Sequence, residues 1–248
     1  MRQLTIGIVC EGDRDYDMIA ETIMHFTGQE FKFRWLHPNP EFGTEFGAGW
    51  KGVWHWCATK SGILDHYLKG VTSAVDLLIV QMDADVARCE HEAYCSKVPI
   101  DCAGQATEDP LNCGIAKKSG CLQPLPPNSV CDGNPQSRVD YLSGVISELL
   151  VLQEDSPVVI TIPCDSTDTW IIAVFENDIQ NPEVLESPWG NVIARKKDYY
   201  GFRIPGKRKA KQPYLAMIEQ VCENWETVKE KCPQALAFEL SVQRIFDL

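Results

Sequence analysis

Three carboxylates follow two apolar segments of this 248-residue chain, each at the point where the segment ends. Glu11 comes directly after residues 4–10, and Asp83 and Asp85 come directly after residues 75–82. Apolar runs of this length predict strands that are buried on both faces of a sheet. Because side chains that follow parallel strands collect at one edge of the sheet, we expect the three acids to lie together.

Three neighbouring acids repel one another unless a cation neutralises them. A set of carboxylate oxygens suits Mg²⁺ or Mn²⁺. A metal ion in such a site can neutralise phosphoryl oxygens and activate the attacking water. We therefore predict that Glu11, Asp83 and Asp85 are catalytic residues and metal ligands of a site for phosphodiester chemistry.

Three further acids lie near the ends of predicted strands. Asp15 lies on the first turn of the helix after the first strand, where it can support the metal site or simply favour the helix dipole. Asp165 and Asp168 follow the predicted strand at 158–162. If that strand neighbours the first one, both Asp165 and Asp168 can reach a second metal ion. The alternative for this segment is a plain helix N-cap.

Basic residues are concentrated in one part of an acidic chain. The whole chain has 23 basic and 35 acidic residues and a net charge of −12, which argues against non-specific adhesion to nucleic acid over the whole surface. The segment 195–211, here called the basic strip, has eight basic residues and one acid, so it carries +7 and leaves −19 elsewhere. The strip is either a solvated loop or a binding site for a phosphate backbone.

We expect Lys207 to stabilise developing charge near the scissile phosphate, with Lys209 as the other choice. The residues of the strip that we expect to bind nucleic acid are Arg203, Lys207, Arg208, Lys209 and Lys211.

Strand and helix patterns alternate along the chain. This predicts an α/β fold with a mostly parallel sheet and helices on both faces. The expected strands are at about 3–10, 31–36, 75–82 and 158–162. The expected helices are at about 13–27, 50–69, from 137 onward, 213–230 and 233–246. Ser137 resembles the start of a capping box, and a tryptophan-rich face of the second helix is more typical of a buried surface than of base stacking.

A cysteine-rich segment interrupts this pattern. Residues 1–88 form the first part of the predicted core, 89–136 an irregular insertion, and 137–248 the rest of the core with the C-terminal helices. Six of the chain's eleven cysteines lie in the insertion: Cys89, Cys95, Cys102, Cys113, Cys121 and Cys131. None of them has Cys-x-x-Cys spacing, so free thiols, disulfides and a Zn²⁺ site all stay open.

Two features of the sequence resemble the Toprim domain of topoisomerases, bacterial primases and the nucleases of the overcoming-lysogenization-defect class. The first is Glu11-Gly12 after a strand with Asp15 four residues later, and the second is the pair Asp83-x-Asp85. The segment 162–173 is similar to a strand-to-helix segment of small stand-alone Toprim-like proteins among bacterial anti-phage defence genes. The resemblance covers mainly residues 1–88 and is weaker over residues 137–220. It implies a Toprim/Rossmann-like sheet and a metal at the three acids.

These observations predict a metal-dependent nuclease, and the resemblance implies an effector of an anti-phage defence system that acts on DNA or RNA. The alternative is a Toprim-like regulatory module that binds a partner protein and does no chemistry. A third hypothesis, a primase-like polymerase, is weaker because no additional domain for template handling is recognisable. No run approaches the roughly 18 apolar residues of a membrane span, and the N-terminus lacks a signal-peptide pattern. We therefore expect a cytoplasmic protein without a membrane partner.

Overall fold

A four-stranded parallel sheet forms the centre of the molecule in the computed structural model, which describes residues 3–38, 48–70, 74–87, 134–195, 201 and 209–246. The strand order is β2-β1-β3-β4, and every neighbouring pair is parallel. The strands are β1 (Thr5–Val9), β2 (Lys32–His37), β3 (Leu77–Gln81) and β4 (Val158–Thr161). The predicted α/β class and parallel sheet are confirmed.

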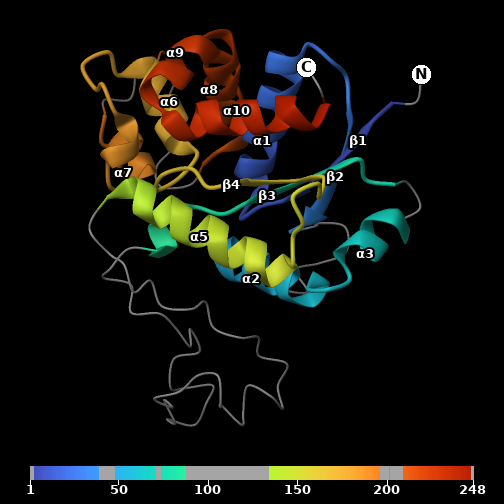
Figure 1. The fold of residues 1–248 in the computed structure, drawn as a ribbon. Helices are drawn as coiled ribbons and strands as arrows, with labels where there is room; N and C mark the ends of the chain where they lie inside the picture. Colours follow the sequence, from blue (N-terminus) through green and yellow to red (C-terminus); the bar gives the residue numbers. More distant parts are fainter. Residues whose placement is uncertain are drawn as a thin grey trace, which may run out of the picture.

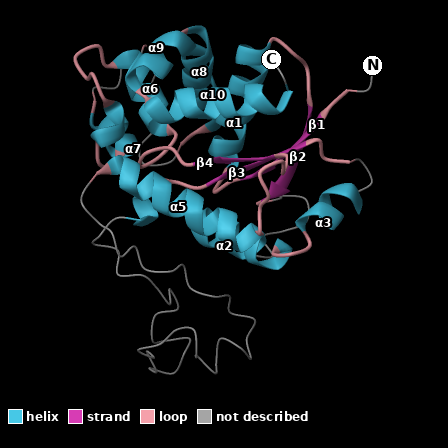
Figure 2. Cartoon of the chain, viewed as in Figure 1, coloured by secondary structure: helices cyan, strands magenta, loops and turns pink. Residues whose placement is uncertain are grey.

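Helices cover both faces of the sheet (Figures 1 and 2). One face carries α1 (Asp13–Thr27), α6 (Asp168–Phe175), α8 (Lys211–Glu223), α9 (Trp225–Lys231) and α10 (Pro233–Phe246). The other face carries α2 (Gly49–Lys60), α3 (Leu64–Gly70) and α5 (Pro135–Leu150). Shorter elements are η1 (Ala84–Ala87), η3 (Pro182–Val184) and α7 (Pro188–Ala194).

The central strands β1 and β3 are buried along their whole length. Because alternate side chains of a strand point to opposite faces, Leu77 and Ile79 pack with α1 and α6, whereas Leu78 and Val80 pack with α2 and α5. This arrangement explains why both strands read as continuous apolar runs in the sequence.

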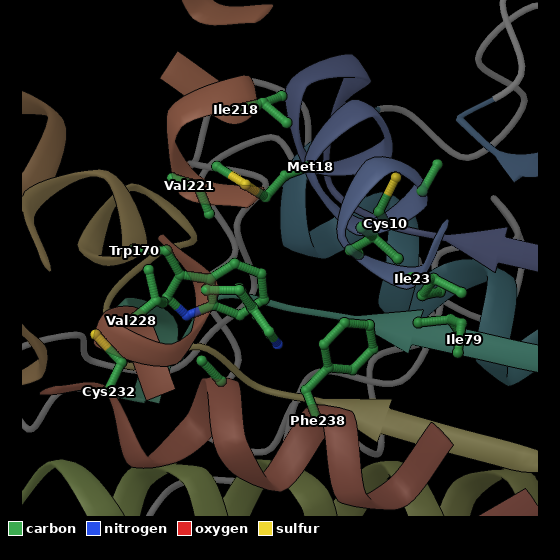
Figure 3. Packing of buried hydrophobic residues seen from close by; sticks show 14 of the residues in the cluster. Cys10, Met18, Ile23, Ile79, Trp170, Ile218, Val221, Val228, Cys232 and Phe238 are labelled. Carbon is green, nitrogen blue, oxygen red and sulfur yellow. The ribbon is translucent and has the colours of Figure 1, made fainter. Parts of the chain in front are cut away.

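The larger core cluster centres on Trp170 of α6. Its ring meets Trp225 edge-on, with centroids 5.4 Å apart, and stacks on Phe238 at 6.0 Å. Figure 3 shows these helices converging with Met18 of α1 and Val221 of α8 beside β3. The packing joins the C-terminal helices to the first helix, so both ends of the chain build one core.

Several helix boundaries differ from the sequence expectations. The stretch 50–69 forms two helices because Gly62, with φ +69°, separates α2 from α3. The stretch 213–230 is also divided, between α8 and α9 at Asn224. The predicted capping box at Ser137 is wrong, because α5 begins at Pro135 and the Asn134 side chain accepts the hydrogen bond from the Gln136 amide.

The tryptophan-rich helix α2 packs against the sheet, as expected. Trp54 and Trp56 are buried, and Trp50 is half-buried in the first turn. The cysteine-rich insertion lies outside the described residues, apart from the start of α5. In the described part of the chain, no helix is long and apolar enough to cross a membrane.

Candidate functional site

Glu11 and Asp83 come together at the carboxyl ends of the two central strands. β1 and β3 are paired in parallel with Val9 opposite Val80, so the residues that follow them leave the sheet at the same edge. The Oε1 atom of Glu11 accepts a hydrogen bond from the backbone N–H of Asp83, with an N···O distance of 2.7 Å. The juxtaposition expected from the sequence is therefore present.

Gln81, the last residue of β3, connects these two acids. Its Oε1 accepts from the Glu11 backbone N–H at 3.1 Å, and its Nε2 donates to Asp83 Oδ1 at 2.6 Å. Gln81 is fully buried. Sequence reasoning missed this residue, although a lone amide at the end of an apolar strand was a usable signal.

The N-terminus of α2 also meets Glu11. The Gly49 N–H donates to the Glu11 carbonyl oxygen at 3.0 Å, and the Trp50 backbone N–H donates to the Glu11 carboxylate. Gly49 has φ +72°, which favours glycine, and a Cβ atom there would lie 3.7 Å from Glu11 Oε2. The positive end of the helix dipole therefore points at a carboxylate.

Burial and mutual repulsion raise the pKa values of this acid group. The pKa of Glu11 rises to about 8, mainly because the carboxyl is buried and also because Asp15 and Asp85 are near, against the hydrogen bond from Asp83. The pKa of Asp83 is raised well above its usual value by burial and by the charges of Glu11 and Asp15. These acids hold their negative charge poorly without an added cation.

Asp85 lies in η1, directly after Asp83, and its side chain is exposed. Its negative charge contributes to the raised pKa values of both Glu11 and Asp83. The three acids selected from the sequence therefore interact electrostatically. Asp85 forms the solvent-facing part of this group.

Asp15 and Asp168 form a second, more deeply buried pair. The Thr167 hydroxyl donates to Asp15 Oδ1 at 2.8 Å, and the Tyr214 hydroxyl donates to Asp168 Oδ1 at 2.9 Å. The Nζ of Lys209 lies 2.8 Å from Asp168 Oδ2. The sequence pointed to Asp15 and Asp168 separately, but it did not indicate that Lys209 pairs with Asp168.

The strand before Asp165 is not a neighbour of the first strand. β4 pairs with β3, and β1 lies beyond β3. The Oδ1 of Asp165 is 4.0 Å from Arg138 Nη1, and its Oδ2 accepts from the Ser187 N–H at 2.8 Å. The condition for a second metal at Asp165, a strand beside the first one, is therefore not met, and these contacts connect the β4 end to α5 and α7.

The structure describes three basic residues of the basic strip, and each has different surroundings. Arg195 Nε lies 2.9 Å from Glu176 Oε1, Lys209 reaches Asp168, and Lys211 is exposed at the start of α8. Arg203, Lys207 and Arg208 lie outside the described residues. Their predicted contacts with nucleic acid stay predictions, as does the chemical role of Lys207.

Within the described ranges, no group of three or more His, Cys, Asp or Glu side chains has the geometry of a ready metal site. The six cysteines of the insertion lie outside those ranges, so the alternatives of thiols, disulfides and Zn²⁺ stay open. Comparisons with family models, with curated proteins and with solved structures found no match to this chain.

Proposed function

We propose that the chain is a metal-dependent phosphodiester hydrolase that cleaves nucleic acid. The observation that carries the proposal is the contact between Glu11 and Asp83, with Asp85 close enough to raise the pKa values of both. Acids with raised pKa values at the carboxyl end of a parallel sheet suit a divalent cation, which would favour their charged forms. The effector role in anti-phage defence is the part of the proposal that comes only from the Toprim resemblance.

The donor chemistry of the site fits Mg²⁺ or Mn²⁺. Glu11, Asp83 and Asp85 supply only oxygen ligands, which hard divalent cations prefer. A carboxylate oxygen that accepts one hydrogen bond keeps a further lone pair for a metal, so the Asp83 and Gln81 contacts are compatible with binding. When bound, the metal would neutralise phosphoryl oxygens and make water a better nucleophile.

The protein's own residues prepare this site. The Gln81 amide orients Asp83, and the N–H groups of Asp83 and Trp50 orient the Glu11 carboxylate. Lys209 lies near enough to lower the pKa of Asp83, opposing the effect of the neighbouring acids. The site therefore holds its acids in fixed positions before any substrate arrives, as preorganised catalysis requires.

The second candidate function is a regulatory module that binds a partner protein. One observation favours it: the Glu11 carboxylate already joins β1 to the Asp83 turn and to α2, so a structural role would account for a buried acid here. The two candidate functions differ in whether they require the negative charge of Glu11. Nuclease activity requires that charge, whereas the structural contacts require only hydrogen-bond acceptors.

Cleavage assays with isosteric variants separate these functions. Purified protein should cleave labelled single- or double-stranded DNA or RNA only with Mg²⁺ or Mn²⁺. Glu11→Gln and Asp83→Asn should each abolish cleavage, because they remove a ligand charge but keep an oxygen acceptor. Asp65→Asn, a change at an exposed acid of α3, is the control and should be fully active. Full metal-dependent activity in both site variants would exclude this site.

A further inference from the structure

Lys209 forms an internal ion pair beside the candidate metal site. Its Nζ is 2.8 Å from Asp168 Oδ2, and its side chain is 26% exposed whereas that of Asp168 is 2% exposed. The ammonium also lies 5.8 Å from the ring centre of Trp189 and 5.5 Å from that of Tyr214. A cation enclosed by a carboxylate and two aromatic rings is part of a built site, in contrast to a solvated surface charge.

Hydroxyl groups fix the carboxylate that receives Lys209. The Tyr214 hydroxyl donates to Asp168 Oδ1 at 2.9 Å, and the Ser166 hydroxyl donates to Oδ2 at 3.1 Å. The backbone of Lys209 is held as well, because Arg14 Nε donates to its carbonyl oxygen at 3.2 Å. Both partners of the ion pair are therefore positioned by further contacts.

Asp15 belongs to the same group. Burial raises the pKa of its carboxyl, and the Lys209 charge and the Thr167 hydroxyl oppose that effect, while Asp168 adds to it. Burial alone would lower the pKa of Lys209, but its surroundings raise it above its usual value. Burial and the charge of Asp168 also raise the pKa of Tyr214, so its phenol is neutral at pH 7. The positive charge of Lys209 is therefore stabilised by the acids and not by a phenolate. Asp168 thus binds the ammonium directly, and Asp15 lies near enough for the Lys209 charge to lower its pKa.

This second group adjoins the first. Gly12, the residue after Glu11, lies against Asp15, because a Cβ atom at Gly12 would be 3.5 Å from Asp15 Oδ2. The charges of Lys209 and Asp15 also shift the pKa of Asp83, in opposite directions. The first group contains Glu11, Asp83 and Asp85, and the raised pKa values of Glu11 and Asp83 favour an added cation. The second group has similar oxygen donors but already contains a cation.

We propose that the Lys209 ammonium takes the place of a second divalent cation, so that the centre binds one metal at Glu11, Asp83 and Asp85. This inference deepens the proposed function, on which it rests. An ammonium 2.8 Å from Asp168 occupies the position where a second metal would bind and repels another cation there. Because Lys209 is still 26% exposed, a phosphate oxygen of the substrate can approach it.

The number of Mn²⁺ ions bound per chain tests the proposal without nucleic acid. Free Mn²⁺ is counted by electron paramagnetic resonance at saturation in the wild type and in Lys209→Met, which keeps an apolar chain but removes the charge. Lys209→Met should bind one more Mn²⁺ ion than the wild type, at Asp15 and Asp168. Adding Asp168→Asn to Lys209→Met should return the number to the wild-type value. Lys211→Met, an exposed neighbour, is the control and should leave it unchanged.

Equal numbers of bound Mn²⁺ ions per chain in the wild type and in Lys209→Met would overturn the proposal. A second Mn²⁺ ion in the wild type that disappears in Asp168→Asn would also overturn it, and this measurement remains informative if Lys209→Met fails to fold. Zero ions in the wild type and one in Lys209→Met would support the exchange of cations while contradicting the metal site of the proposed function. The two proposals therefore fail on different results.

Discussion

The Glu11 carboxylate accepts a hydrogen bond from the Asp83 backbone N–H at 2.7 Å, although the two residues are 72 positions apart in the chain. The contact crosses from the end of β1 to the end of β3 and fixes both acids at one edge of the sheet. It also brings the Glu11 carboxyl close enough for its charge to raise the pKa of Asp83.

The stability of the metal-free protein should fall as pH rises from about 4.5 to about 8. The pKa of Glu11 is raised from 4.5 to about 8, so the folded state keeps a proton that the unfolded state has lost in this range. The stabilisation is complete below pH 4.5 and is lost above pH 8. Because Glu11 keeps some solvent access, we expect a loss of about 1–2 kcal/mol from this group, or roughly 2–8 °C in Tm. Differential scanning calorimetry with EDTA across this pH range measures it.

Glu11→Gln is the matched control for this pH dependence, because glutamine keeps the acceptor for the Asp83 amide and cannot titrate. Its Tm should decline less than that of the wild type over the same range. An identical decline in both proteins would assign the pH dependence to other groups.

Mg²⁺ or Mn²⁺ should stabilise the folded protein at pH 8. A ligand that binds only the folded state at about 100 times its Kd adds about 2.7 kcal/mol, which corresponds to roughly 5–10 °C in Tm for a chain of this size. Asp83→Asn should lose most of this increase, because it removes one ligand charge, whereas Asp65→Asn should retain it. An equal increase in Asp83→Asn and wild type would show that the metal acts elsewhere.

Charge reversal in the basic strip should weaken nucleic-acid binding across sequences. The double change Lys207→Glu with Arg208→Glu removes phosphate contacts, and each lost contact should flatten the slope of log K against log salt by about 0.9 on duplex DNA. Fluorescence anisotropy in EDTA, across a salt series, measures the slope without cleavage. Lys69→Glu, at a site 80% exposed on α3, is the control for a change of net charge. A slope equal to that of the wild type would mean that the strip is a solvated loop.

Trp170→Ala should destabilise the protein by about 3–5 kcal/mol, because it empties a fully buried site between Trp225 and Phe238. Leu236→Ala, at a site 41% exposed on α10, should change stability by about 0.5 kcal/mol or less. Urea denaturation of both variants gives the comparison. If Trp170→Ala lowers the free energy of unfolding by less than about 1 kcal/mol, the packing of the C-terminal helices in the larger core cluster is contradicted.

The sequence predicted β1, β3 and β4 from their apolar runs and β2 from alternating aromatic and charged residues. A parallel sheet follows from strands that alternate with helices. The meeting of Glu11 with Asp83 was predictable for the same reason. Strand order was harder, since the apolar pattern does not say which strands are neighbours. The position of β4 beside β3 decided which of the later acids approach the first ones.

Contacts between distant side chains were the least predictable part of the site. Lys209 lies in a run of basic residues that is typical of a solvated loop, and only the fold brings it to Asp168. Gln81 lies at the end of an apolar strand, and the sequence pattern does not indicate that its amide bonds to both Glu11 and Asp83. Such long-range pairs depend on tertiary packing, which local periodicity does not encode.

Anomalous diffraction from a crystal soaked in Mn²⁺ tests the central claim most directly. We predict a peak of anomalous density coordinated by carboxylate oxygens of Glu11, Asp83 and Asp85, and its disappearance in Asp83→Asn crystals soaked in the same way. A well-occupied peak elsewhere, or empty density among the three acids at saturating Mn²⁺, would contradict the assignment of this site as a metal centre.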